Sequence, residues 1–236
     1  MNETFLKSTL PISRPLAILV IFFFMWGSYL MGGFVFDGGD YILGRDFVNM
    51  WHYGLSAFFD DPGRYYEIAI YNTALDELVP GHDYKDQQFS YPPHFMLIAA
   101  PLGLLPYNLA LLTFMGSSLA LFWAYVLKPL EKSSQNVLIW APACAFAFIC
   151  GQLSFLLVVV FAGVLRTMDK RPLIAGLLIA LLTIKPQIGF LFPIFLLATG
   201  RYKVFAYAGI CTVLLIASSL AIHGVGVWET YITSAS

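Results

Sequence analysis

Charged residues are scarce in this chain of 236 residues, and their scarcity decides the class of protein. Only 11% of the residues are Asp, Glu, Lys or Arg, whereas 59% are hydrophobic and 17% are aromatic. A soluble domain contains about 25% charged residues, so the composition excludes an ordinary soluble domain. With a mean hydropathy of +0.75, the sequence predicts an all-α integral membrane protein that crosses the bilayer several times.

Cysteine is also rare, and the motifs of several enzyme classes are missing. The three cysteines, Cys144, Cys150 and Cys211, lie in apolar segments, where a small buried hydrophobic residue is the simplest interpretation. The sequence has no HExxH, CxxC, glycine-rich phosphate loop or EF-hand pattern. Metalloprotease and nucleotide-binding chemistry therefore have no support. We predict that the protein requires neither a metal ion nor another cofactor, and that it binds no nucleic acid.

The uncharged stretches predict about seven transmembrane helices in a single module, residues 1–236. Residues 16–36 carry no charge and follow Lys7 and Arg14, which is typical of a retained signal anchor with a cytoplasmic N-terminus. Residues 108–127 and 204–222 are two further predicted crossings. The chain is thus expected to be a multi-pass protein of the plasma membrane.

Two apolar runs, residues 137–165 and 172–200, are each 29 residues long and are each interrupted by polar residues. A Gly-Gln pair at 151–152 interrupts the first run, and a Lys-Pro-Gln triplet at 185–187 interrupts the second. If each run were one helix, the basic loop at 166–171 would lie opposite the other basic loops, which the positive-inside rule disfavours. We therefore predict two hairpins of short half-helices, whose turns line a recess within the membrane because they do not reach its far surface.

Acidic residues gather in one segment, residues 37–93, which holds ten of the fourteen carboxylates. We place this segment on the extracytoplasmic side, opposite the basic loops. From 46 to 59 the apolar residues follow helical spacing, with Asn49, His52 and Ser56 on the other face, and residues 64–79 repeat the pattern. The sequence therefore predicts two amphipathic helices that lie at the membrane interface.

Two charged residues are candidates for chemistry, and each has a structural alternative. Asp46 stands at the start of a predicted helix, where an aspartate caps free backbone N–H groups, but a carboxylate at this place could also act as a general base. Lys185 lies in an apolar run, where lysine is rarely kept without a function, although its side chain could simply extend to the outer interface. Four more residues could donate hydrogen bonds to a phosphate: Tyr91, His94, Gln152 and Gln187.

The order of several short motifs resembles glycosyltransferase family 87. In chain order, the segments that carry the resemblance are GRDFVNMWHYGLSAFF, FSYPPHFMLIAAPLGLLP, GQLSFLL and AGLLIALLTIKPQIGFLFPIFLLA. Members of this family are integral-membrane GT-C enzymes that include mannosyltransferases dependent on polyprenyl-phosphate-mannose. The resemblance implies a GT-C-like bundle of transmembrane helices. It also implies that the chain corresponds to the N-terminal part of a longer protein.

The resemblance further implies a reaction and a set of site residues. The donor would be a polyprenyl-phosphate hexose in the membrane lipid, with mannose as the hexose in the family. The acceptor would be a hydroxyl of an extracytoplasmic glycan or glycolipid, and the anomeric centre of the sugar would be inverted on transfer. In the family the first extracytoplasmic loop supplies the catalytic aspartate, which corresponds to Asp46. The donor phosphate and sugar would be bound by Lys185, His94, Tyr91, Arg64, Arg45, Gln152 and Gln187.

The sequence alone is compatible with two other functions. Broken helices that meet near the middle of the membrane also occur in transporters, so the chain could be a flippase for a lipid-linked sugar. Against this function, no inverted repeat is evident between the two halves. The chain could also be a non-catalytic membrane subunit, or a remnant of such an enzyme, that binds a partner through its aromatic outer loop.

Overall fold

The computed structural model describes residues 42, 44–59, 61–79 and 87–234, and all statements below refer to these residues. Within them the chain is all helical, as the composition predicts. The predicted signal anchor at 16–36 lies outside the described residues.

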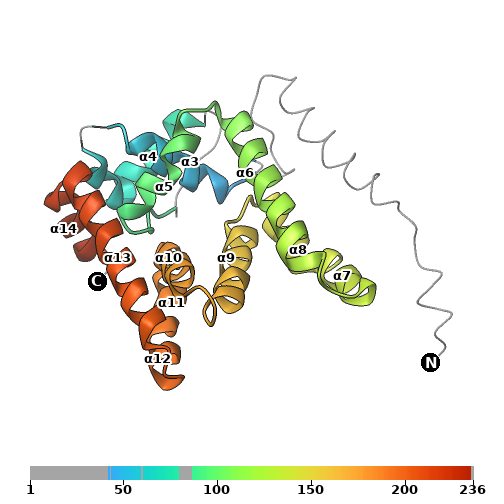
Figure 1. Ribbon diagram of the computed structural model, residues 1–236. Helices are drawn as coiled ribbons and strands as arrows, with labels where there is room; N and C mark the ends of the chain where they lie inside the picture. The colour runs from blue at the N-terminus through green and yellow to red at the C-terminus, as the bar shows by residue number, and fades with distance from the viewer. Residues whose placement is uncertain (1–41, 43, 60, 80–86, 235–236) are drawn as a thin grey trace.

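The helices form three groups along the chain (Figure 1). The first group contains α3 (Phe47–Ser56), the 3-10 helix η1 (Pro62–Tyr66) and α4 (Ile68–Leu78), and together with residues 87–93 we call it the head region. The second group contains α5 (His94–Gly103), α6 (Tyr107–Phe122) with its π-helical extension η2 (Trp123–Leu127), α7 (Lys132–Ile139), α8 (Pro142–Ile149) and α9 (Ser154–Thr167). The third contains α10 (Pro172–Leu182), α11 (Pro186–Gly189), α12 (Leu191–Ala198), α13 (Tyr202–His223) and α14 (Val225–Ser234).

Two of these segments are long and apolar enough to cross a membrane, Tyr107–Leu127 and Tyr202–His223. They agree with the crossings predicted at 108–127 and 204–222. The bent pair of α8 and α9 makes a third if it counts as one span. The chain is therefore a membrane protein, whereas the total of about seven crossings stays a prediction.

Both long apolar runs are broken where the polar residues stand. α8 and α9 are separated at residues 150–153, and their axes differ by 118°. α10 and α11 are separated at residues 183–185. The first run is divided once more between α7 and α8, so its N-terminal arm is shorter than the predicted half-helix. The breaks are confirmed, whereas their assignment as membrane hairpins stays a prediction.

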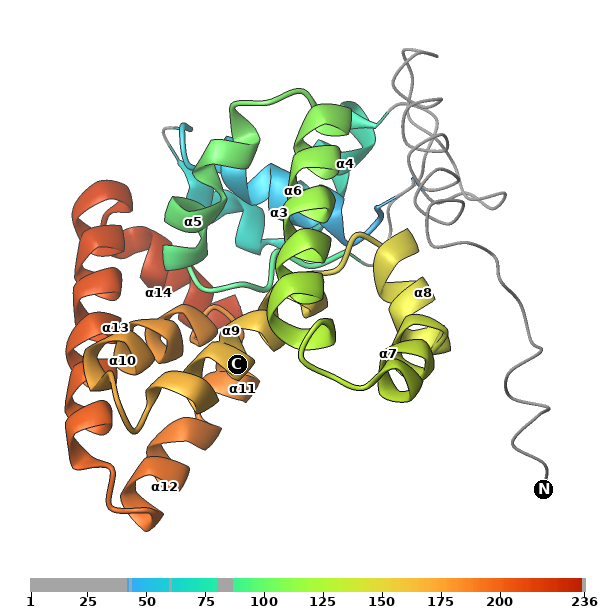
Figure 2. The same ribbon diagram turned by 45° about the vertical axis from the view of Figure 1, so that its right-hand side comes forward.

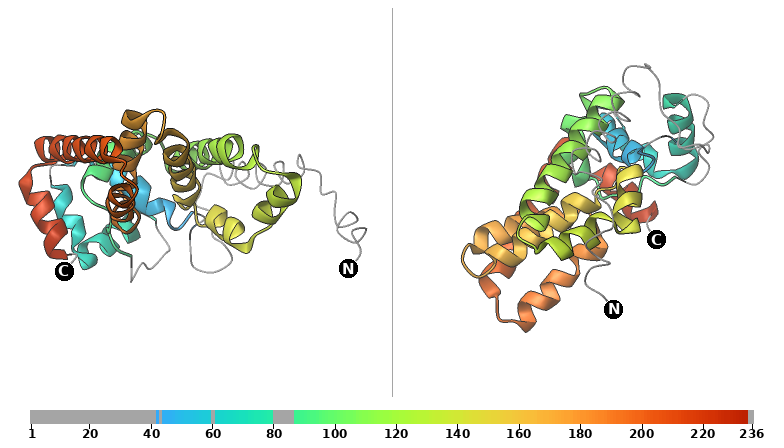
Figure 3. Two further views of the ribbon diagram at one scale, coloured as in Figure 1. Left: turned by 60° about the horizontal axis from the view of Figure 1, so that its bottom comes forward. Right: turned by 90° about the vertical axis from the view of Figure 1, so that its right-hand side faces the viewer.

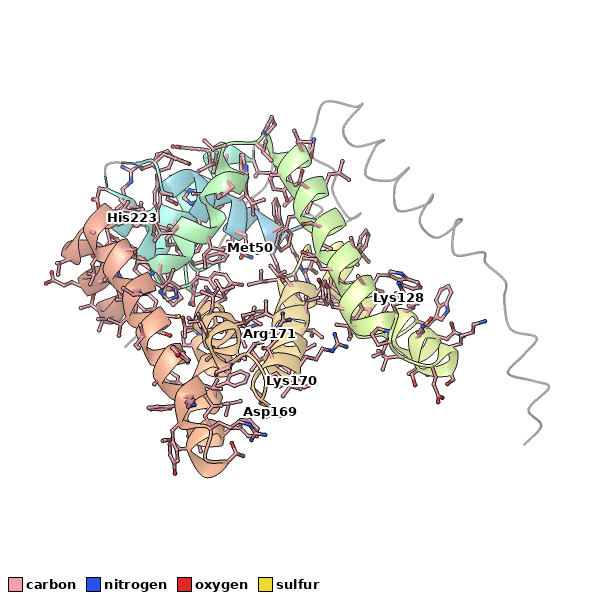
Figure 4. The ribbon with its side chains drawn as sticks, in the orientation of Figure 1. Met50, Lys128, Asp169, Lys170, Arg171 and His223 are labelled. Atoms are coloured by element: carbon pink, nitrogen blue, oxygen red, sulfur yellow. The ribbon has the colours of Figure 1, made fainter. Side chains whose placement is uncertain are left out.

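Four helices, α13, α10, α9 and α6, pack side by side in that order (Figure 3). Gly176 of α10 permits the close contact with α13, because a Cβ at this position would lie 2.6 Å from the Cβ of Tyr207. Basic residues lie at the ends of these helices that point away from the head region, and Figure 4 shows Lys170 and Arg171 between α9 and α10. This separation of charge fits the placement of the head region opposite the basic loops.

Helix α3 is enclosed by protein. At its crossing with α5 two glycines meet, because a Cβ on Gly103 would lie 2.2 Å from the carbonyl carbon of Gly54. Seven of the ten residues of α3 are buried, and they include His52 and Ser56. The helix predicted at 46–59 is therefore confirmed as α3, although its polar residues His52 and Ser56 are enclosed by protein. Its place at the membrane interface stays a prediction. The aromatic rings in contact with His52 belong to Tyr65, Tyr71 and Phe89.

The second predicted amphipathic helix, residues 64–79, consists of two pieces. Pro62 starts η1 at a position that tolerates the missing N–H. Glu67 then has an extended backbone, with φ −81° and ψ 119°, before α4 begins. Only Tyr71, Asn72 and Leu75 of α4 are buried, so this helix keeps the amphipathic character that the sequence predicts.

Helix α14 folds back from the end of α13 and contacts η1 (Figure 2). The turn uses Gly224 with a φ of 82°, a conformation that favours glycine. Tyr231 of α14 then packs against Tyr66 with 5.4 Å between the ring centroids. The head region is thus held between α5 and α14.

Candidate functional site

The Gly-Gln pair ends α8 in a Schellman motif, in which two N–H groups beyond the helix bond back to its last turn. The N–H of Gly151 donates to the carbonyl of Phe148 at 3.1 Å, and that of Gln152 donates to the carbonyl of Ala147 at 2.8 Å. Gly151 has a φ of 65°, in the left-handed region. The chain therefore leaves α8 abruptly, and Gln152 is the first residue after the turn.

The end of α8 abuts the start of α3. The N–H of Asp46 donates to the carbonyl of Cys150 at 2.9 Å, and the N–H of Gly44 donates to that of Ile149 at 3.0 Å. The last carbonyls of one helix and the first N–H groups of the other thus satisfy each other. The contact requires glycine at position 151, because a Cβ there would lie 2.7 Å from the Cβ of Phe47.

The carboxylate of Asp46 points to Gln152. Its Oδ2 accepts a hydrogen bond from Nε2 of Gln152 at 2.7 Å, and Oε1 of Gln152 accepts one from the hydroxyl of Ser154 at 3.1 Å. The side chain of Asp46 makes no capping hydrogen bond to α3, so the capping alternative is wrong. The N–H of Phe47, at the start of α3, donates instead to the carbonyl of Cys150 at 3.3 Å.

Asp46 lines a cavity of about 290 Å³. The lining residues come from α3, from residues 87–91 and from the two helix breaks: Asp46, Asn49, Met50, Gln87, Gln88, Ser90, Tyr91, Gln152, Leu153, Ser154 and Lys185. Met50, a lining residue on α3, is labelled in Figure 4. In the described part of the chain, no three His, Cys, Asp or Glu side chains gather closely enough to hold a metal ion. The cavity brings the acidic segment and both polar breaks together.

Lys185 is the cationic residue of this cavity. Pro186 starts α11, and the residue before a proline is kept out of the helical conformation. Lys185 accordingly has φ −118° and ψ 88°, beyond the end of α10. Its side chain is exposed and lines the cavity together with Asp46. One cation and one carboxylate therefore face the same cavity.

Tyr91 is held through its backbone. The hydroxyls of Tyr53 and Tyr66 each donate to its carbonyl at 2.9 Å, and its N–H donates to the Tyr53 hydroxyl. Burial and the negative charge of Asp46 raise the pKa of the Tyr91 side chain. Its hydroxyl therefore stays protonated at neutral pH and can donate a hydrogen bond at the edge of the cavity.

One wall of the cavity is polar and uncharged, and its residues Asn49, Gln87, Gln88 and Ser90 were not predicted as part of the site. The hydroxyl of Tyr71 donates to Oδ1 of Asn49, whose Nδ2 donates to Oε1 of Gln87 at 3.0 Å. Asn72 Oδ1 accepts from the backbone N–H of Gln87 at 3.1 Å. These contacts fix the direction of both side-chain amides. The run of polar residues before the Tyr-Pro-Pro segment was the available signal, but it does not reveal which helix lies beside them.

Four residues that the sequence assigned to the site do not line the cavity. The guanidinium of Arg45 lies over the ring of Phe146, with 5.1 Å from Cζ to the centroid. Arg64 is exposed and donates to the hydroxyl of Tyr65 at 2.8 Å. Gln187 is exposed as well. His94 is buried behind the second helix break, where its Nε2 lies 3.3 Å from the hydroxyl of Thr183.

A family model described as glycosyltransferase family 87 matches residues 89–235, which is more than half of the chain. The matched stretch includes the Tyr-Pro-Pro segment, the Gly-Gln pair and the Lys-Pro-Gln triplet. It begins after Asp46, so the match covers the walls that face this residue but not the residue itself. No curated protein and no solved structure matches the chain.

Proposed function

Because the chain belongs to glycosyltransferase family 87, we propose that the cavity at Asp46 transfers a sugar from a lipid phosphate carrier to a hydroxyl group. The donor in this proposal is a polyprenyl-phosphate hexose, with mannose as the hexose. The acceptor is a glycan or glycolipid on the extracytoplasmic side of the plasma membrane. One observation carries the proposal: a hydrogen-bonded carboxylate, Asp46, shares a cavity with a lysine, Lys185.

Sugar transfer of this kind needs a base and a counter-charge for the leaving group. Asp46 takes the proton from the acceptor hydroxyl as the hydroxyl oxygen attacks the anomeric carbon. The bond between that carbon and the phosphate oxygen breaks, the electron pair leaves with the phosphate, and the anomeric centre is inverted. The ammonium of Lys185 and the hydroxyl of Tyr91 stabilise the charge that develops on the phosphate.

The acceptor side of the cavity is assigned to the uncharged wall. Asn49, Gln87, Gln88 and Ser90 offer amide and hydroxyl groups, which pair with the hydroxyls of a neutral sugar. Since Asn49 and Gln87 are already bonded to each other, little side-chain freedom is lost when an acceptor binds.

The donor side is assigned to the lipid-facing helices that follow Lys185. Phe190, Leu191 and Ile194 have exposed fractions of 74%, 65% and 70%. Exposed large apolar side chains that follow a cation in the chain suit a lipid whose tail lies in the bilayer and whose phosphate reaches the cavity. The polyprenyl carrier and the choice of mannose rest on the family.

The test is sugar transfer by the purified full chain in lipid nanodiscs. Labelled polyprenyl-phosphate mannose and polyprenyl-phosphate glucose are offered as donors, with a membrane glycolipid extract as acceptor and a nucleotide sugar as the control donor. We expect transfer from a polyprenyl-phosphate sugar only, with a product linkage opposite in anomeric configuration to the donor. Asp46→Asn should lower the rate by about 10³-fold, and Lys185→Ala should mainly raise the donor KM.

Other outcomes would separate the remaining functions. Transfer from the nucleotide sugar, or an Asp46→Asn variant with the wild-type rate, would overturn the proposal. A flippase would move the labelled lipid across proteoliposome membranes equally well with and without the Asp46 carboxylate. A non-catalytic subunit would show neither activity.

A further inference from the structure

Gln152 connects the carboxylate of Asp46 to helix α9. A carboxylate only accepts hydrogen bonds, so the amide group that faces Oδ2 of Asp46 at 2.7 Å has to be the NH₂ group. The amide oxygen then faces the other way, where the hydroxyl of Ser154 donates to it at 3.1 Å. Both ends of the amide are therefore occupied, and each bond favours the same orientation of the side chain.

The backbone holds both ends of this chain of hydrogen bonds. Gln152 is the residue that follows the left-handed Gly151 in the Schellman motif, and Asp46 donates its own N–H to Cys150 of the same turn. Ser154 is the first residue of α9. The three side chains start from fixed backbone: the start of α3, the turn after α8 and the start of α9. The carboxylate therefore cannot rotate without breaking a charge-assisted hydrogen bond.

We propose that Gln152 and Ser154 are positioning residues for the base, and that the Gln152 amide is not a contact for donor sugar or phosphate. Gln152 holds Oδ2 of Asp46, so that Oδ1 takes the proton of the acceptor hydroxyl. Ser154 holds the amide of Gln152 in the orientation that donates to Asp46. This inference rests on the proposed role of Asp46 as the base.

A positioning role and a substrate-binding role predict different kinetics. A residue that orients the base acts on the chemical step, so its loss lowers kcat and leaves the donor KM unchanged. A residue that binds the donor phosphate or sugar raises the donor KM or Kd when it is lost. The same distinction holds for hydrolysis of the donor, because water as the acceptor also needs the base.

The variants are Gln152→Leu, which keeps the size of the side chain and removes the donor, and Ser154→Ala. We expect Gln152→Leu to lower kcat by about 10- to 100-fold, the range found when a residue that orients an active group is replaced. Ser154→Ala should lower it about fivefold, as the loss of one hydrogen bond predicts. Ser154→Thr keeps a hydroxyl at the same place and should restore most of the rate.

Coupling between the two residues is the sharper test. If Ser154 acts only through Gln152, the double variant Gln152→Leu, Ser154→Ala should be no slower than Gln152→Leu alone. On the inactive Asp46→Asn background, Gln152→Leu should leave the donor Kd within about twofold, because the amide does not contact the donor.

Controls come from one glutamine and one serine outside the cavity, each of which donates a side-chain hydrogen bond to a backbone carbonyl. Gln135→Leu removes an amide that donates to the carbonyl of Leu130 at 2.9 Å, and Ser117→Ala removes a hydroxyl that donates to the carbonyl of Phe114 at 3.0 Å. Both should keep the wild-type kcat. They measure the effect of losing such a bond without any change at Asp46.

Three results would overturn the inference: a higher donor KM or Kd in Gln152→Leu, additive losses in the double variant, or a wild-type kcat in Gln152→Leu. In each case the wild-type protein still transfers sugar and Asp46→Asn does not, so the proposed function survives. If the wild type transfers no sugar, or if Asp46→Asn keeps the wild-type rate, the proposed function fails and the positioning role fails with it.

Discussion

The head region and helix α13 use the same kinds of residue in opposite ways. In α3, seven of ten residues are buried, whereas in α13 only three of twenty-two are buried. Tyr53 of α3 has no exposed surface, and its hydroxyl bonds to the backbone of Tyr91. Tyr207 of α13 is 37% exposed. Helix α3 is packed as the core of a soluble domain is packed, while α13 leaves most of its apolar side chains exposed, as is typical of a membrane-spanning helix.

This difference indicates which parts of the protein tolerate substitutions without loss of stability. A site that must hold a carboxylate in one orientation needs neighbours that cannot move, and dense packing with bonded polar groups supplies them. A helix that faces lipid needs only to be apolar and long enough. We therefore expect the same substitution to lower stability strongly in the head region and weakly in α13.

Alanine at the glycine crossing of α3 and α5 should give the largest effect. In Gly103→Ala the new Cβ would lie 2.2 Å from the backbone of Gly54, so the two helices have to separate. We expect the free energy of local opening at α3 to fall by about 3 kcal/mol. Hydrogen exchange of the α3 amides in nanodiscs measures this change, as exchange about 100-fold faster.

The matched control is the same substitution on α13. A Cβ on Gly209 meets nothing within 4 Å, so Gly209→Ala should leave exchange in α3 unchanged. Equal effects of the two substitutions would contradict the difference between the head region and α13.

Acid should destabilise the head region through His52. Burial, with a smaller contribution from the positive charge of Arg64, lowers the pKa of His52 to about 4. An unfolded histidine takes up its proton near pH 6.5, so the unfolded state binds more protons between the two values. The stability that His52 contributes is complete above pH 6.5 and is lost as the pH falls toward 4, on the order of 3 kcal/mol in total.

The measurement is the thermal unfolding of the protein at pH 7 and pH 5, for the wild type and for His52→Phe. A phenyl ring can take the place of the imidazole among the rings of Tyr65 and Tyr71, whose centroids lie 4.6 and 5.1 Å away. The variant should lose less stability than the wild type between the two pH values. If the wild type and His52→Phe lost equal stability between pH 7 and pH 5, His52 would be already protonated in the folded state or would not be enclosed.

Local patterns predicted the parts of this structure that depend on local chemistry. Hydropathy gave the crossings at α6 and α13, helical spacing gave α3, and charge distribution gave the break at the Gly-Gln pair. The contact between Asp46 and Gln152 joins residues 106 positions apart, and no local pattern contains it. The capping rule failed at Asp46 for the same reason, because the carbonyl of Cys150 accepts the N–H groups at the start of α3. The sequence places His52 on the polar face of α3, but it does not show that the rings of Tyr65, Tyr71 and Phe89 cover this residue.

The two tyrosines that bond to the backbone of Tyr91 should contribute differently to the free energy of unfolding. This difference is the smallest effect that we predict in the head region. Tyr53→Phe removes a hydroxyl that donates to the carbonyl of Tyr91 and accepts from its N–H, so a buried N–H loses its partner. Tyr66→Phe removes one of two donors to the same carbonyl, which Tyr53 still serves. We expect the free energy of unfolding to fall by about 2 kcal/mol in Tyr53→Phe and by about 1 kcal/mol or less in Tyr66→Phe. Thermal unfolding of both variants measures the difference, and since each keeps its ring, equal losses would mean that the Tyr91 N–H finds another partner.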